Sequence, residues 1–164
     1  MRSVFLSFAL LFIGGLSSNA QEIPQKPSQD DVAHRTDKVM DLAAGSTTHH
    51  FRLLKDGGEI IVTANDPKDN ATIKQIRLHL SQMVGMFSNG NFNAPMLVHD
   101  TTPPGVSTMT RLKSDIRYTV SDVDRGAKIR IAAATPETTD AVHAFLLFQI
   151  IDHKTGDSPA ITDN

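Results

Sequence analysis

The feature that most constrains the fold is a strand–turn–strand–helix pattern that occurs twice along the chain. In the first copy, Phe51 and Leu53 alternate with their neighbours in the manner of a half-buried β-strand. A glycine-containing turn at 56–58 leads into a second strand over 59–64. A helix is expected over 67–88, where apolar residues recur on one face at helical spacing.

The second copy follows the same plan closer to the C-terminus. Alternation over 116–120 predicts a strand, a turn follows at 124–126, and alternation over 129–133 predicts the partner strand. A helix is then expected over 136–153. Because a tight turn joins the two strands of each copy, each pair should form an antiparallel hairpin.

The two expected helices begin with the same device. Asp66-Pro67 and Thr135-Pro136 each supply a capping side chain followed by a proline at the first helical position. These two pairs lie 69 residues apart. The same offset relates Gly57 to Gly126, Ile60 to Ile129 and Val62 to Ile131. The pattern indicates an internal repeat, although such turns and caps are also common by chance.

These elements predict an α+β fold. Two hairpins should form one antiparallel sheet with the two main helices on one face, as a duplicated ββα unit with pseudo-two-fold symmetry. The predicted domain covers 46–156, with the first ββα over 46–88 and the second over 115–156. Between them lies a connecting segment over 89–114, and a long segment of this kind often carries function.

The N-terminus has the features of a secretory signal peptide over residues 1–20. Arg2 precedes an apolar run over 4–13, and small residues at 18–20 resemble a cleavage site. The mature chain is therefore expected to begin near Gln21 and to act in the periplasm or outside the cell.

The segments that flank the domain are polar. Residues 21–45 form a predicted N-terminal arm, with a disordered spacer over 21–33 and a loosely ordered stretch over 34–45. Residues 157–164 are predicted to be a frayed tail. No apolar run after the signal peptide approaches the length of a membrane span, so no span is expected in the mature chain.

Composition excludes several classes of protein. Cleavage removes Arg2 and no acidic residue, so the net charge becomes −3, which argues against a nucleic-acid-binding protein. The chain has no cysteine, which rules out disulfides, thiolate zinc sites and a cysteine nucleophile. A metal site would have to use histidine, methionine or carboxylate ligands, a set that suits copper when imidazole and thioether combine.

Histidine and methionine recur in patterns that could hold a metal. His79 and Met83 lie one turn apart on the first main helix, with Met86 one turn further along the same flank. Met96 and His99 form an M-x-x-H sequence in the connecting segment. The alternative is ordinary: a methionine on a helix flank usually fills a core, and a single histidine is usually a surface residue.

The predicted metal site combines these groups. It consists of His99 and Met96, joined by His49 or His50 and by His79. Neighbouring residues on a strand point to opposite faces, so only one of His49 and His50 can face a given site.

A second candidate site is basic. Arg77 and Arg111 come from the central part of the chain, and Asp100 and the Pro-Pro-Gly turn at 103–105 lie between them. Together with His99 they could line a cleft for an anion or another small molecule. The alternative is a solvated surface with scattered ion pairs.

No sequence motif of a known enzyme class is present: G-x-S-x-G, the Walker sequence, G-x-G-x-x-G and H-E-x-x-H are all absent. The leading hypothesis is therefore a non-catalytic exported binding or accessory domain, with copper as a candidate ligand. The alternatives are a small-molecule or anion site, or an unrecognised enzyme, using Arg111, His99 and Asp100. A third hypothesis is a structural module of the cell envelope that forms a homodimer or binds an envelope protein.

Several phrases of the sequence resemble an uncharacterised family of small exported bacterial proteins. These are residues 33–40, residues 47–53, Pro95 to Asp100 together with Pro103 to Val106, and residues 153–157. Some members of that family carry an automatic label of aspartate carbamoyltransferase. The chain lacks the Ser-Thr-Arg-Thr-Arg and His-Pro-x-Gln segments of that enzyme, and export would separate it from carbamoyl phosphate. The resemblance therefore implies export and no particular mechanism.

Overall fold

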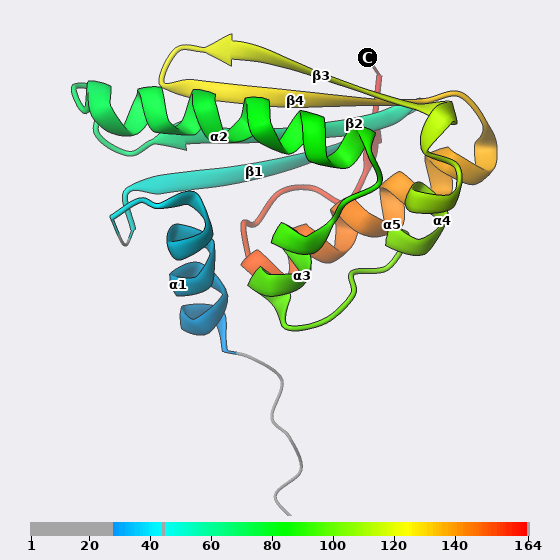
Figure 1. The fold of residues 1–164 in the computed structure, drawn as a ribbon, viewed down its shortest axis with the longest axis horizontal. Coiled ribbons are helices and arrows are strands. Elements are labelled where there is room, and N and C mark those ends of the chain that lie inside the picture. Colours follow the sequence, from blue (N-terminus) through cyan, green and yellow to red (C-terminus); the bar gives the residue numbers. More distant parts are fainter. Residues whose placement is uncertain (1–27, 44, 164) are drawn as a thin grey trace, which may run out of the picture.

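The computed structural model describes residues 28–163 apart from Ala44 (Figure 1). The predicted signal peptide and the first part of the predicted spacer lie outside the described residues. Within the described part of the chain, no helix has both the length and the apolar character that crossing a membrane requires.

The described residues form one five-stranded sheet beside a layer of helices. Strands β1 (Thr47–Leu54) and β2 (Gly57–Ala64) make the first hairpin, and β3 (Ile116–Val123) and β4 (Gly126–Ala133) make the second. The strand order is β3-β4-β2-β1-β5, and β5 (Ile161–Thr162) pairs in parallel with β1. The two hairpins meet through antiparallel pairing of β2 with β4.

Helices α2 (Asn70–Ser88) and α5 (Pro136–His153) pack against the inner face of this sheet (Figure 1). The predicted α+β fold with two hairpins and two main helices is therefore confirmed. Three shorter helices complete the helical layer: α1 (Gln29–Met40), α3 (Asn93–His99) and α4 (Val106–Arg111). A 3₁₀ turn at Lys113–Asp115 follows α4.

The two hairpins share one register. Leu54 pairs with Gly57 across the first two-residue turn, and Val123 pairs with Gly126 across the second. In the centre of the sheet Ile60 pairs with Ile129, which is also its counterpart in the second copy, 69 residues further along the chain. The strand pairing thus has the arrangement expected of a pseudo-two-fold axis between β2 and β4; duplication of an ancestral unit remains a prediction.

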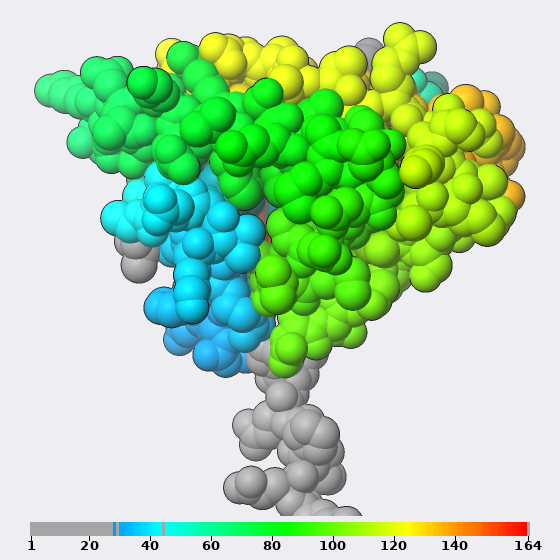
Figure 2. All heavy atoms as spheres, in the orientation of Figure 1, coloured from blue at the N-terminus to red at the C-terminus, as the bar shows by residue number. Residues whose placement is uncertain are grey.

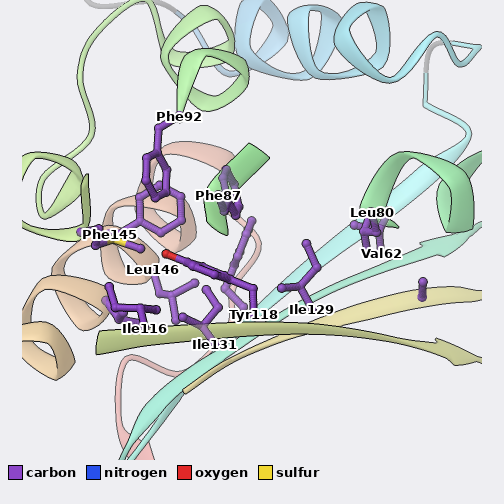
Figure 3. Close-up of a cluster of buried hydrophobic side chains, with 14 of the residues drawn as sticks. Val62, Leu80, Phe87, Phe92, Ile116, Tyr118, Ile129, Ile131, Phe145 and Leu146 are labelled. Atoms are coloured by element: carbon purple, nitrogen blue, oxygen red, sulfur yellow. The ribbon is translucent and has the colours of Figure 1, made fainter. Parts of the chain in front are cut away.

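Aromatic side chains close one end of the space between sheet and helices. Phe87 of α2 stacks on Phe92 at 4.6 Å between ring centroids and meets Tyr118 of β3 at 5.7 Å. Phe145 of α5 meets both phenylalanine rings edge-on (Figure 3). All four rings are buried, so this end is a dense hydrophobic core.

The start of α2 differs from the prediction. The N-cap is Asp69, whose carboxylate accepts the Thr72 N–H at 3.0 Å, and Asp66 instead accepts the Lys68 N–H within the preceding turn. Pro67 therefore lies before the helix. The matching prediction for α5 is confirmed, because Thr135 caps that helix through the Thr138 N–H.

The predicted disordered spacer and loose arm are wrong for residues 29–40, which form α1. Ser28 and Asp31 make a capping box at its start, a signal that sequence analysis overlooked. Val32 and Met40 are buried on the body of the protein. The N-terminal helix thus contributes to the core.

The predicted frayed tail is also partly ordered. Its residues Ile161–Thr162 extend the sheet beside β1. Asp157 precedes them and accepts the Phe51 N–H at 2.9 Å, which ties the chain to the edge of the sheet. The backbone groups on the free edge of β1 account for this order, since they offer hydrogen bonds to any strand that lies alongside.

Candidate histidine-lined site

A cavity of about 80 Å³ lies between the inner face of the sheet and four helices, beside the aromatic cluster, whose Phe87 and Phe145 line one side of it. Among the described residues, the histidines that line it are His49 of β1, His79 of α2, His99 of α3 and His153 of α5. The rest of the lining is mainly apolar. The structure therefore brings together three of the predicted metal ligands and adds His153, which was not predicted.

The imidazole rings lie close to one another. The rings of His49 and His153 are nearly parallel, with an interplanar angle of 14° and 5.7 Å between centroids. His99 meets His153 edge-on at 5.0 Å. His79 is near enough to His49 to influence its charge. The rings of His49, His153 and His99 thus form one chain of contacts, and His79 lines the same cavity.

Strand alternation selects His49 for this site. His49 pairs with Val62 on the inner face, whereas His50 faces outward and its Nδ1 lies 2.9 Å from the Asp157 carboxylate. Of the two histidines that the sequence offered, His49 is therefore the one that lines the cavity.

On α2, the one-turn spacing places His79 and Met83 at the cavity together. Met86 is not part of the lining, because a further turn carries it away from the centre of the site. The thioether of Met83 is therefore the sulfur donor that α2 offers beside the imidazoles.

His99 is held by α5. Its Nδ1 lies 2.7 Å from Asp152 Oδ2, and its Nε2 lies 2.8 Å from Gln149 Oε1. A ring that donates to both oxygens is an imidazolium, whose charge Asp152 balances. With the amide turned over, a neutral ring would accept from Gln149 Nε2 instead. In both states the two ring nitrogens are engaged, so His99 fixes α3 to α5 and has no nitrogen to offer a ligand.

The other imidazoles are neutral at neutral pH. Burial, together with the nearby His79 and His50, lowers the pKa of His49 to about 4. Burial and the neighbouring His49 and His99 lower the pKa of His153 to about 3, against the opposing influence of Asp152. Burial also lowers the pKa of His79. Each of these rings therefore carries one nitrogen with a free lone pair.

None of these neutral rings is hydrogen-bonded within the part of the chain that the structure describes: the ring nitrogens of His49, His79 and His153 have no partner there. Gln149, which also lines the cavity, has a buried Nε2 that lacks a partner among the same residues. The three imidazoles are half-buried, so Gln149 Nε2 is the buried polar group at this cavity that departs from the usual rule of pairing.

The donors are not set at fixed coordination positions. Across residues 28–163 without Ala44, no three His, Asp or Glu side chains are spaced to hold a metal ion directly. An ion in this cavity would require rotation of the imidazoles or fewer than three such ligands.

The other predicted ligands lie apart from the cavity. Met96 is half-buried on α3 and does not line it. Asp100 is the exposed residue that ends α3, in a left-handed conformation with φ of 52°.

The two predicted arginines are far from each other. Arg77 donates to the carbonyls of Gly126 and Val123 at the turn between β3 and β4. Arg111, at the end of α4, forms an exposed ion pair with Glu137 at the start of α5. These points lie at opposite ends of the sheet (Figure 1). The predicted cleft of Arg77, Arg111 and His99 is not formed.

Sequence reasoning missed the contribution of α5. Gln149, Asp152 and His153 are polar residues that share one flank of a helix that is otherwise apolar. Polar residues at i, i+3 and i+4 in so apolar a segment are a signal of paired or functional groups. That signal was available in the sequence.

Comparison of the chain with protein-family models, with curated proteins and with solved structures finds no match. The resemblance to small exported bacterial proteins therefore stays a prediction, and the geometry of the cavity is what bears on function.

Proposed function

We propose that this chain is an exported, non-catalytic binding protein whose ligand is a transition metal ion, copper(I) in particular, held in the histidine-lined cavity. The observation that carries the proposal is the set of neutral imidazoles, His49, His79 and His153, that face one cavity without hydrogen-bond partners among the described residues. Neutral imidazole is the form of histidine that binds metals.

The donor set favours copper over harder ions. Imidazole nitrogens stand beside the thioether of Met83, and carboxylates contribute little to the cavity lining. Thioether and imidazole ligands suit copper(I), whereas magnesium and calcium require oxygen. Because the imidazoles are already deprotonated at neutral pH, no proton competes with the metal.

The size and geometry of the cavity support the same ligand. A volume of about 80 Å³ accommodates an ion and excludes a haem-sized cofactor. Copper(I) is stable with only two or three ligands, so it does not need the preset group of three side chains that is absent from the described residues. Rotation of His49 and His153, whose rings make no hydrogen bond to another described residue, would complete the coordination.

Equilibrium dialysis of the chain from Gln21 against copper(I), copper(II) and zinc(II) tests the proposal. We expect stoichiometric binding of copper(I), which the combined substitution of His79→Ala with His153→Ala abolishes. His50→Ala and His143→Ala are matched controls, since His50 faces Asp157 and His143 binds the Leu54 carbonyl. Absence of stoichiometric uptake, or uptake unaffected by the double substitution, would contradict the proposal.

Export and partners belong to the same proposal. A copper-binding protein of the periplasm would deliver its ion to an envelope protein or act as a homodimer. Light scattering over a range of protein concentrations distinguishes a monomer from a dimer. A monomer at all concentrations would contradict the proposed homodimer.

A further inference from the structure

Most of the wall of the histidine-lined cavity is hydrocarbon. All four neighbouring helices contribute to it, through Met40 of α1, Leu80 of α2, Val98 of α3 and Phe145 of α5. Among the described residues, the lining contains no aspartate, glutamate, lysine or arginine. Such a wall suits an uncharged organic molecule, because an organic ion would lose its hydration without a free opposite charge beside it.

Gln149 adds one directed polar group to this wall. The residue is buried, with 4% of its surface exposed. Its Oε1 lies 2.8 Å from His99 Nε2, and with His99 donating to that oxygen, Nε2 has no acceptor among the described residues. A buried N–H group without an acceptor costs free energy, so an occupant of the cavity that carries an acceptor would remove that cost.

The volume of the cavity limits the size of the occupant. One water molecule needs roughly 10–15 Å³, and a cavity of roughly 150 Å³ in another protein binds benzene. A cavity of about 80 Å³ lies between these two cases. Scaled on benzene, it takes an occupant of about three to five non-hydrogen atoms.

A carbonyl oxygen is the group that matches Gln149. It accepts hydrogen bonds through two lone pairs, and a ketone or aldehyde brings no N–H or O–H group that would need a partner of its own. A water molecule could accept the same bond, but it would leave the hydrocarbon of the wall without contacts of its own kind.

We infer that the metal-free cavity binds a small uncharged ketone or aldehyde, whose oxygen accepts from Gln149 Nε2 and whose hydrocarbon lies against Met40, Leu80 and Phe145. This inference goes beyond the proposed function, because it concerns the protein without its metal. Since both ligands would occupy the same small cavity, the carbonyl compound and copper(I) should exclude each other.

The cavity adjoins a seam on the surface of the protein. Figure 2 shows this narrow seam between α1 (blue to cyan) and the green segment of α2 and α3. Val39 of α1 and Pro95 of α3 both line the cavity, so the seam leads toward it past hydrocarbon. An uncharged molecule gives up less hydration than an ion on such a path.

Two probes of similar shape test the inference: acetone, and isobutene, in which a methylene group replaces the carbonyl oxygen. Each is titrated into the metal-free chain from Gln21 with isotope-labelled methionine methyl groups, and NMR follows the signals. Acetone should shift the methyl signals of Met40 and Met83, which line the cavity, and not those of Met86 and Met96, which do not. Acetone but not isobutene should also shift the side-chain amide signals of Gln149. If neither probe moves the Met40 and Met83 signals, the inference is overturned.

A pair of matched substitutions tests the hydrogen bond. Gln149→Met keeps the length of the side chain and removes its N–H groups, whereas Gln82→Met makes the same change at an exposed position of α2. The ratio of the acetone affinity to the isobutene affinity should fall about fivefold or more in Gln149→Met and stay unchanged in Gln82→Met. An equal ratio in all three proteins would overturn the role of Gln149. If Gln149→Met does not fold, the amide signals of the wild-type protein decide the same point.

Copper(I) separates this inference from the proposed function. Acetone at saturation should weaken copper(I) binding, and copper(I) binding of unchanged strength would overturn the mutual exclusion. Acetone binding by a protein that takes up no copper(I) would overturn the proposed function and support the inference. Uptake of copper(I) by a protein that responds to neither probe would overturn the inference and leave the proposed function in place.

Discussion

The two ends of the molecule place different residues at corresponding positions. In the register of the sheet, His49 of β1 occupies the place that Tyr118 holds in β3, since His49 pairs with Val62 and Tyr118 with Ile131. Tyr118 packs against Phe87 near the end of α2, and His49 packs against His153 at the end of α5. Both ring pairs have centroids 5.7 Å apart.

The two ends differ in which side chains fill the space between the sheet and the helices. At the β3 end, Phe87, Phe92 and Phe145 fill the space with hydrocarbon. At the β1 end, neutral imidazoles face a cavity without hydrogen-bond partners in the described residues. Hydrocarbon at those positions would stabilise the fold more, and the proposed metal site offers a physical reason for the histidines.

The largest expected contrast comes from truncating one ring at each end. Phe87→Ala should lower the free energy of unfolding by about 3–5 kcal/mol, because it opens a void among packed rings. His153→Ala should cost about 1 kcal/mol or less, since the ring is only half-buried and its loss leaves no described residue without a hydrogen-bond partner. Urea unfolding of both variants provides the comparison. Equal losses would mean that the histidine end is an ordinary core.

The second contrast lies within the histidine group itself. His99→Leu should destabilise the protein by about 2–4 kcal/mol, because it leaves the buried Asp152 carboxylate without its imidazole partner. His79→Leu should change stability by no more than about 0.5 kcal/mol, since His79 makes no hydrogen bond to another described residue. Thermal and urea denaturation can measure both. A large loss for His79→Leu would assign that ring a structural role.

The two ends should also respond to pH in opposite directions. Since the pKa values of His49 and His153 are lowered to about 4 and 3, the unfolded chain takes up protons there first as the pH falls. Stability then decreases below the unfolded value of 6.5, by about 1.4 kcal/mol per pH unit for each ring. Burial raises the pKa of Tyr118, so the aromatic end loses stability as the pH rises above 10.0.

The control for this prediction removes each titration separately. Urea midpoints measured between about pH 5 and 6.5 should depend less on pH in His49→Phe and His153→Phe, and those above pH 10 should depend less on pH in Tyr118→Phe. If the loss of stability at acid pH is the same in the histidine variants as in the wild-type protein, the pKa values of these rings are not lowered in the folded protein.

The smallest contrast concerns the two helix caps. Asp69→Ala and Thr135→Ala should each cost about 1 kcal/mol, because each removes the acceptor of a first-turn N–H. Asp66→Ala should cost only a few tenths, since Asp66 supports a turn before the helix. Circular dichroism with urea titration measures all three. A greater loss for Asp66→Ala than for Asp69→Ala would place the start of α2 where the sequence pattern predicts it.

The strands, their turns and α5 could be predicted because local rules determine them. Alternation defines β3 and β4, and Thr135-Pro136 marks the start of α5. The start of α2 could not be predicted in the same way, because Asp66 and Asp69 both offer a capping carboxylate. The path of the backbone between them decides which one caps the helix.

The site was predictable only in part, for a related reason. His49 and His79 could be identified from residue type and spacing along one strand and one helix. His153 could not be joined to them, because its contact with His49 depends on how α5 crosses the sheet. The predicted pairing of Arg77 with Arg111 was wrong. Arg77 lies on α2 and reaches the turn between β3 and β4, whereas Arg111 lies on α4 and reaches the start of α5, so the fold separates the two side chains.

X-ray absorption at the copper edge of the copper(I)-loaded protein tests the central claim most directly, because it identifies the atoms bound to the metal. We predict that the spectrum contains the outer-shell scattering that is typical of imidazole ligands and the signal of one sulfur atom bound to copper. The sulfur signal should disappear in Met83→Leu and persist in Met86→Leu, since Met83 lines the cavity and Met86 does not. A spectrum of oxygen ligands without histidine scattering, or a sulfur signal that survives both Met83→Leu and Met40→Leu, would contradict the assignment of the histidine end as the metal site, since both of these methionines line the cavity.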